Sequence, residues 1–259
     1  MPFVSPEVFA KQRITAIQDY SVLSGRAIAN LFSSPIYWAD IFTQMDSIGV
    51  GSLPIVVLTG FFTGCVLALQ SATSLQAFGA VSMTGNLVAL SMVKELGPVL
   101  TGLMVSGRNA SGMASELGSM KVTEQIDAMR ALGTDPVRKL VTPRLAATVF
   151  MLFFLTIMSD AVGIAGGALV SVALLGLNAS SYFHNSYRAL VYADVVQGLT
   201  KPIFSGFIIA TVGCYFGMNT KGGTQGVGKA TTQAVVISSV FIIIVDFIVS
   251  RAMIGIFGR

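Results

Sequence analysis

Long stretches of this sequence contain no acidic or basic residue. No Asp, Glu, Lys or Arg occurs between Asp46 and Lys94, nor between Arg144 and Asp160. Only 11% of all residues are charged and 53% are apolar, whereas about a quarter of the residues in a soluble domain are charged. A chain this poor in charge cannot cover a globule with polar surface, so lipid is its predicted solvent. The first stretch is long enough for helices of about 20 residues, the length that crosses a bilayer core.

Hydropathy predicts five membrane-spanning helices, preceded by one helix of a different kind. Residues 7–32 are too polar to span, but their apolar side chains recur every three or four positions. That pattern is typical of an amphipathic helix lying in the membrane interface. We therefore expect an all-α integral membrane protein, with an amphipathic interfacial segment at 1–45 and a five-helix permease domain at 46–259. The predicted spans are 50–70, 85–105, 145–175, 202–218 and 233–257.

Small residues recur at four-residue spacing in two of these spans. Gly60, Gly64 and Ala68 form one such stripe, and Gly163, Gly167 and Ser171 form another. Stripes of this kind let the backbones of two membrane helices approach closely. Cys65 and Cys214 lie in apolar runs and are interpreted as packing residues rather than as a disulfide or metal site.

The distribution of Lys and Arg indicates which side of the membrane each connection faces. Eleven of these residues fall in the N-terminal segment, the polar segment 106–144 and a glycine-rich loop at 219–229, and three fall on the opposite side. Cytoplasmic connections carry the excess of basic residues. The N-terminus and the segment 106–144 are therefore predicted to be cytoplasmic.

A short amphipathic helix is predicted within the segment 106–144. Val122, Ile126, Met129 and Leu132 follow helical spacing, and Gly133 is placed to end the helix. So short a helix is not stable alone. It needs a surface to pack on, either the bundle of its own chain or a partner protein.

Ordered motifs run through the chain from about residue 45 to the C-terminus. They are Lys94–Pro98 (KELGP), Gly107-Arg108, Glu116–Met120 (ELGSM), Thr123–Ile126 (TEQI), Asp135-Pro136, Pro143-Arg144, Gly228–Val236 (GKATTQAVV) and Asp246-Phe247. Together they closely resemble the MlaE (YrbE) permeases of bacterial MCE transport systems. The N-terminal 45 residues match that family only in their amphipathic character.

The resemblance implies the permease subunit of a phospholipid transporter in the bacterial inner membrane. Such permeases form a homodimer that two cytoplasmic ABC-type ATPase subunits drive. A ring of MCE-domain proteins lies on the periplasmic side, and a small STAS-domain protein often binds the ATPase. The cargo is phospholipid, moved between the inner and outer membranes, which maintains the lipid asymmetry of the outer membrane.

The same resemblance makes the short helix of the segment 106–144 a coupling helix that enters a groove on the ATPase. The expected coupling residues are Glu116, Met120, Glu124, Gln125, Ile126, Asp127 and Met129.

Lys94 and Glu95 are adjacent charges inside a predicted span. Each would cost a few kcal/mol if it faced lipid at the bilayer centre, and side chains about 100° apart on a helix do not pair with each other. In one interpretation they line the substrate path at the dimer interface, with Lys94 available to a lipid phosphate. In the other they belong to an ion-pair network, for example with Asp160 or Asp246.

Three apolar residues are candidate contacts for acyl chains in such a path: Leu67, Phe78 and Leu96. Plain core packing is the alternative for all three. Asp160 and Asp246 are single acids within spans, and either a proton relay or hydrogen bonds and ion pairs would explain them.

The sequence predicts no cofactor, no metal site, no nucleic-acid binding and no catalytic residues. Gly223–Ala230 nearly spells a phosphate-binding loop, but Ala230 stands where Ser or Thr is needed to hold magnesium. ATP hydrolysis is therefore expected in a separate chain. Two other functions remain as alternatives: a passive channel or small-solute permease, and a membrane-embedded enzyme that modifies lipids.

Overall fold

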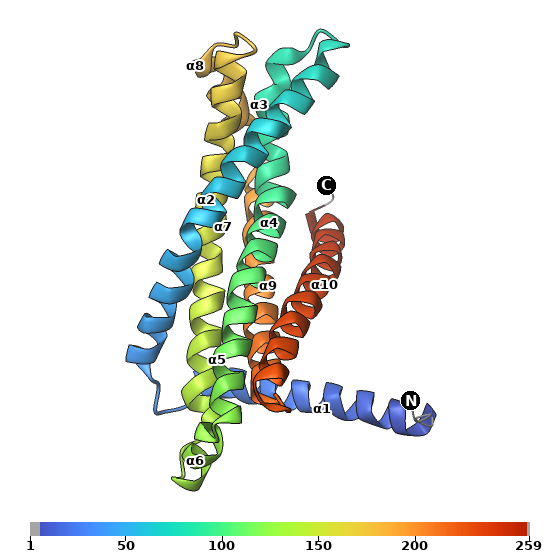
Figure 1. Ribbon diagram of the computed structural model, residues 1–259. Coiled ribbons are helices and arrows are strands. Elements are labelled where there is room, and N and C mark those ends of the chain that lie inside the picture. Colours follow the sequence, from blue (N-terminus) through green and yellow to red (C-terminus); the bar gives the residue numbers. More distant parts are fainter. Residues whose placement is uncertain (1–5, 258–259) are drawn as a thin grey trace.

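The protein is an elongated helical bundle in which helices cross most of its length (Figure 1). The structure is a computed structural model that describes residues 6–257, with side chains from Ile14 onward and that of Lys11. The first five residues of the predicted N-terminal segment, the side chain of Arg13 and Arg259 therefore lie outside the described residues. The α-helices are α1 (Pro6–Leu31), α2 (Trp38–Gln76), α3 (Thr84–Ser91), α4 (Gly97–Val105), α5 (Ser111–Val122), α6 (Gln125–Ala131), α7 (Thr142–Ala173), α8 (Ala179–Ala189), α9 (Tyr192–Met218) and α10 (Gly223–Phe257).

Shorter helical turns join several of these helices into longer rods. One 3₁₀ turn, η1 (Val81–Met83), precedes α3. Three π-helical turns follow, η2 (Met92–Leu96), η3 (Ser106–Ala110) and η4 (Val137–Val141). A π turn holds one residue more than an α turn, and such turns are frequent at functional sites.

The predicted all-α membrane fold with five spans is confirmed. Five helical rods are long and apolar enough to cross a membrane: Trp38–Gln76, Val81–Val122, Val137–Ala173, Tyr192–Met218 and Gly223–Phe257. Every one of them begins earlier or ends later than the sequence predicted. The second rod runs on to Val122, the fourth begins at Tyr192 rather than 202, and the fifth includes most of the predicted glycine-rich loop.

The closest helix packing joins α2 to α7, where the two predicted small-residue stripes meet. A Cβ atom on Gly64 would lie 1.8 Å from the carbonyl oxygen of Gly163, and one on Gly60 would lie 2.8 Å from that of Ser159. Gly60, Gly64 and Gly163 are buried. The backbones touch at these positions, which confirms the predicted role of the stripes.

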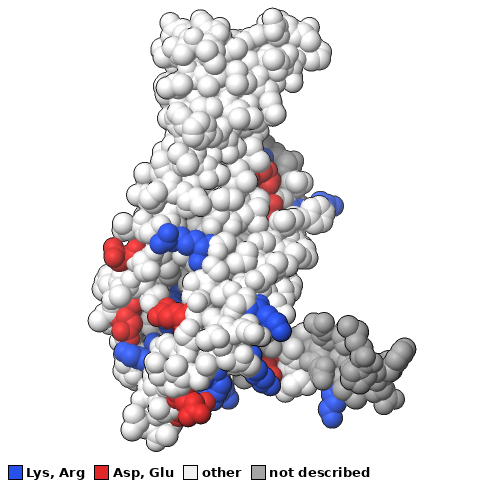
Figure 2. Space-filling view, in the orientation of Figure 1, with Lys and Arg blue, Asp and Glu red and all other residues white. Residues whose placement is uncertain are grey.

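The amphipathic helix α1 lies across one end of the bundle, at the same end as α6 (Figure 1). Arg138 of η4 holds the connection after α1, because its guanidinium donates hydrogen bonds to the Ser34 carbonyl oxygen at 2.9 Å and to Ser33 Oγ at 2.6 Å. Figure 2 shows most of the charged side chains of this face gathered toward the α1 and α6 end, while the opposite end is free of charge. The orientation of the chain in the membrane stays a prediction.

Candidate functional site

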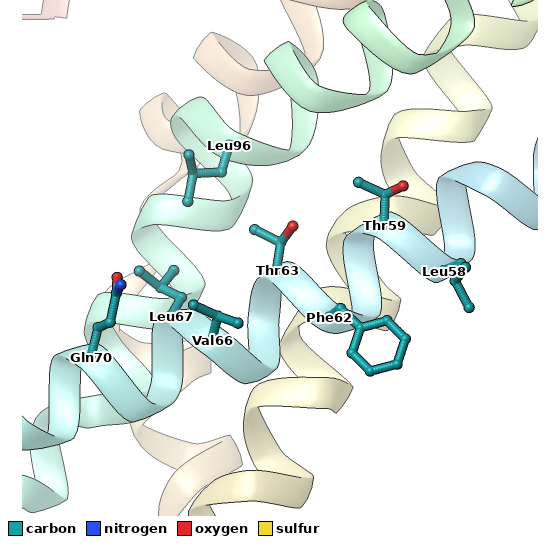
Figure 3. Close-up of a pocket in the computed structure, with 8 residues that line it drawn as sticks. All are labelled: Leu58, Thr59, Phe62, Thr63, Val66, Leu67, Gln70 and Leu96. Atoms are coloured by element: carbon teal, nitrogen blue, oxygen red, sulfur yellow. The ribbon is translucent and has the colours of Figure 1, made fainter.

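An open apolar groove of about 480 Å³ runs along α2 where η2 faces it. Leu67 of α2 and Leu96 of η2 approach it from different helices (Figure 3). Both were predicted as acyl-chain contacts. Phe78 is not among the lining residues, since it lies in the turn after α2 with 84% of its surface exposed. The groove is lined by Leu58, Thr59, Phe62, Thr63, Val66, Leu67, Gln70 and Leu96.

The charged neighbours of Leu96 point away from each other, as the helical geometry requires. Lys94 Nζ lies 3.0 Å from Asp194 Oδ1. Glu95 instead pairs with Lys201 of α9, and the Ser250 hydroxyl of α10 donates to Glu95 at 3.2 Å. The η2 turn is thus tied to both α9 and α10.

An ion-pair network, the alternative interpretation of these charges, is present in the structure. Lys201 Nζ also lies 3.1 Å from Asp246 Oδ1, so one lysine serves two carboxylates. The prediction that Lys201 lies in a loop before the fourth span was wrong: its side chain is only 2% exposed, inside α9. The sequence could not show this, because Lys201 precedes Pro202, which resembled the start of a span.

The predicted phosphate contact of Lys94 is weakened by this geometry. Its ammonium group is paired with Asp194, whose side chain is 8% exposed. A lipid phosphate would have to compete with that buried carboxylate. The general role of Lys94 and Glu95 in a substrate path stays a prediction.

Asp160 does not belong to the network. Its Oδ1 is buried without a hydrogen-bond partner, and it lies against the backbone of Gly97, where a Cβ would be 1.6 Å away. The hydrogen bond or ion pair expected from the sequence is therefore missing at this atom, while Asp246 does have the expected ion pair.

The predicted coupling helix, α6, forms the tip of a hairpin between α5 and η4 at the end of the bundle (Figure 1). Ile126 has no exposed surface and belongs to the same buried cluster as Leu117 and Val141. Met120 and Met129 are partly buried against that cluster. One face of α6 therefore packs on its own chain, and Ile126 holds the helix instead of presenting a surface to a partner.

The other face of α6 is exposed and polar. Glu124 is exposed, adopts a left-handed backbone conformation (φ 59°) just before the helix, and none of the ion pairs between described residues includes it. Gln125 donates to Thr123 Oγ1 at 3.0 Å. Leu132, at the end of the helix, is 84% exposed.

Asp127 is the best-compensated charge on this face. Lys121 donates to one of its carboxylate oxygens at 2.7 Å and Arg130 to the other at 3.2 Å. The hydrogen bond from Lys121 lowers the pKa of Asp127 below its ordinary value. Asp127 is therefore ionised and neutralised by its neighbours at physiological pH, whereas the Glu124 carboxylate makes no ion pair with any described residue.

Glu116 forms an ion pair at the base of the hairpin. Its carboxylate lies 2.8 Å from Arg144 Nη2 at the start of α7, and Arg144 also donates to the Leu140 carbonyl oxygen at 2.7 Å. Arg144 is almost fully buried, while Glu116 is half exposed. The sequence singled out Glu116, but nothing in its local pattern predicted the partner 28 positions away.

The profile of the family described as Permease MlaE matches residues 41–252, which is most of the chain. The chain belongs to the MlaE permease family. The family resemblance seen in the motifs is thereby confirmed. The matched region begins inside α2, so α1 lies outside it.

Relatives of this MlaE-family chain carry related names. It is 43% identical over 236 residues to a probable ABC transporter permease protein of Rickettsia bellii, covering 91% of each chain. It is 36% identical over 245 residues to the intermembrane phospholipid transport system permease protein MlaE of Haemophilus influenzae, covering 92% of this chain and 94% of that one. It is 38% identical over 229 residues to the chloroplastic protein TRIGALACTOSYLDIACYLGLYCEROL 1 of Arabidopsis thaliana, covering 88% of this chain and 65% of that one. This MlaE-family chain is thus a multi-pass membrane permease of the ABC-transporter kind.

Proposed function

We propose that this MlaE-family permease moves phospholipid, with acyl chains lying in the groove between α2 and η2. The groove is the observation that carries the proposal. Its lining is mostly apolar, and Leu58, Phe62 and Val66 remain at least half exposed along it. The lining residues of α2 extend over 12 positions, or about 18 Å of helix. That length suits an acyl chain, which occupies half of a bilayer core of about 30 Å.

Energy for this movement is proposed to come from a separate ABC-type ATPase that binds the hairpin around α6. The exposed face of α6 offers a free carboxylate at Glu124 and an exposed apolar side chain at Leu132. The ion pair between Glu116 and Arg144 connects that hairpin to α7. A displacement of α6 by the ATPase would therefore be transmitted to the membrane-spanning helix α7 through this ion pair.

The assembly we propose is a homodimer in the bacterial inner membrane, with the N-terminus and α6 in the cytoplasm. The gathering of charge at the α1 and α6 end supports this orientation (Figure 2). A periplasmic MCE-domain ring and a STAS-domain protein complete the proposed assembly. The name of the Haemophilus influenzae relative mentions an intermembrane phospholipid transport system, and this supports phospholipid as the cargo.

Replacing Leu67 by tryptophan is expected to block the groove. The larger side chain competes with the acyl chain for the same space. An overpacking penalty of about 1–3 kcal/mol on the bound state corresponds to roughly a tenfold to hundredfold loss of lipid affinity. The measurement is ATP-dependent transfer of labelled phospholipid between liposomes that hold the permease with its ATPase and acceptor vesicles.

Leu169→Trp is the matched control, because Leu169 is 57% exposed on α7 and does not line the groove. It should transfer lipid at the wild-type rate. Equal rates for wild type and Leu67→Trp would show that the groove does not carry the cargo.

Reversing the charge of Glu124 with lysine is expected to weaken ATPase binding several-fold, by about 1 kcal/mol. Glu124 is exposed and unpaired within the described chain, so the change alters the surface and leaves the packing of α6 intact. Co-purification in mild detergent and stimulation of ATP hydrolysis measure the effect. Glu124→Gln is the matched variant, because it removes the charge and leaves the side-chain length and the left-handed backbone as they are, so it should weaken binding less than Glu124→Lys. Normal ATPase binding and transport in Glu124→Lys would argue against the coupling role.

A further inference from the structure

Arg108 lies in a notch on α2 that exists because residue 51 is glycine. A Cβ atom on Gly51 would be 2.4 Å from Nη2 of Arg108 and 3.1 Å from its Cζ. The guanidinium therefore rests directly on the backbone of α2. Arg108 is exposed, and no ion pair between described residues includes it.

The notch lies where α2 enters its charge-free stretch. Asp46, the last charge before that stretch, precedes Gly51 by five residues, and the neighbouring Val50 is 62% exposed. An unpaired guanidinium at this level is unfavourable against hydrocarbon. It is favourable against a phosphate, whose oxygens match the two N–H groups of an arginine fork.

The notch also lies in line with the groove. Gly51, Leu58 and Phe62 are separated by seven and four residues, so they share one face of α2. Leu58 begins the lining of the groove and lies about 10 Å along the helix from Gly51. One lipid molecule, which spans a leaflet of about 15 Å of hydrocarbon, reaches from the notch into the groove.

We propose that Arg108 binds the phosphate of a phospholipid whose acyl chains extend from the notch into the groove. The site lies at the end of the groove nearest α6. Unlike Lys94, which is paired with Asp194, Arg108 has its guanidinium available for an anion. This inference rests on the proposed function and adds the position of the headgroup. Free phosphate has the same chemistry, so the test must separate the two sources.

The test compares three probes on the full chain in detergent micelles. The probes are a phospholipid, a diacylglycerol with the same acyl chains and no phosphate, and inorganic phosphate. Arg108→Gln is expected to weaken phospholipid binding several-fold and to leave diacylglycerol binding unchanged. Gly51→Ala should act in the same way, because the added methyl group meets the flexible end of Arg108 and displaces it. Inorganic phosphate should not compete with the phospholipid.

Arg26→Gln is the matched control for surface charge in general, because Arg26 is an exposed arginine on α1 with no ion pair among those of the described residues. Wild-type phospholipid binding in this variant is the expected result. The inference is overturned if Arg108→Gln binds phospholipid as tightly as wild type, if Arg26→Gln weakens binding equally, or if inorganic phosphate competes.

Leu67→Trp separates this inference from the proposed function. If that variant loses both lipid probes while Arg108→Gln keeps both, the groove holds lipid but the headgroup site is wrong. If wild type binds neither lipid probe, the proposed function itself fails.

Discussion

Replacing Lys201 by methionine is expected to destabilise the protein by about 1.5–3 kcal/mol. The lysine is buried and serves both Glu95 and Asp246. Without it, Glu95 of η2 and Asp246 of α10 lose their shared counter-ion, and solvent offsets part of the cost because their side chains are 44% and 17% exposed. The midpoint temperature of thermal unfolding in detergent should fall. Size-exclusion chromatography or intrinsic fluorescence measures that midpoint.

Removing all three charges tests the reason for that loss. A variant with Glu95→Gln, Lys201→Met and Asp246→Asn leaves no carboxylate without a counter-ion, and it should recover most of the stability. Replacing a buried ion pair as a unit is often neutral, unlike breaking it. A stable Lys201→Met single variant would mean that the network does not hold η2, α9 and α10 together.

Gly64→Ala is expected to force α2 away from α7 and to destabilise the bundle by about 1–3 kcal/mol. The added Cβ would lie 1.8 Å from a backbone oxygen of Gly163, which cannot rotate away as a side chain can. The same unfolding assay measures the loss.

Gly112→Ala is the control on another spanning rod. Nothing lies within 4 Å of a Cβ at Gly112 in α5, so only helix propensity changes, by about 0.5–1 kcal/mol in favour of alanine. If Gly64→Ala unfolds at the same temperature as wild type, the two helices tolerate separation and the close contact is not needed for stability.

The spans could be predicted from the sequence because the hydrocarbon core imposes length and composition on any helix that crosses it. Their ends could not, because polar residues at those ends are buried between helices instead of lying in loops. Ser106 has no exposed surface although it begins the stretch predicted as a polar segment. Gly226 is buried within α10 although it lies in a stretch rich in glycine. Only contacts from other helices reveal such positions, and hydropathy does not record them.

Some residues of the candidate site could be predicted from the sequence, but their contacts with distant parts of the chain could not. Helical spacing showed which residues of α6 share a face, but not that the apolar face, with Ile126, packs against the chain's own core. The adjacency of Lys94 and Glu95 showed that both need partners, but their partners Asp194 and Lys201 are about 100 positions away. From the sequence, Arg108 could not be distinguished from the other basic residues of the predicted cytoplasmic segment. Its contact with Gly51 is visible only in the structure.

The scarcity of acidic and basic residues at the end opposite α6 affects how other molecules reach the protein. No Asp, Glu, Lys or Arg occurs from 47 to 93 or from 161 to 187, and the exposed Arg188 of α8 follows directly after the second of these stretches. A partner approaching here meets little electrostatic attraction, so its encounter rate depends mainly on diffusion and on aromatic groups such as Phe78 and Tyr187, both more than 80% exposed. Assembly at this end should therefore depend only weakly on salt concentration, whereas assembly around α6 should slow more steeply as ionic strength rises.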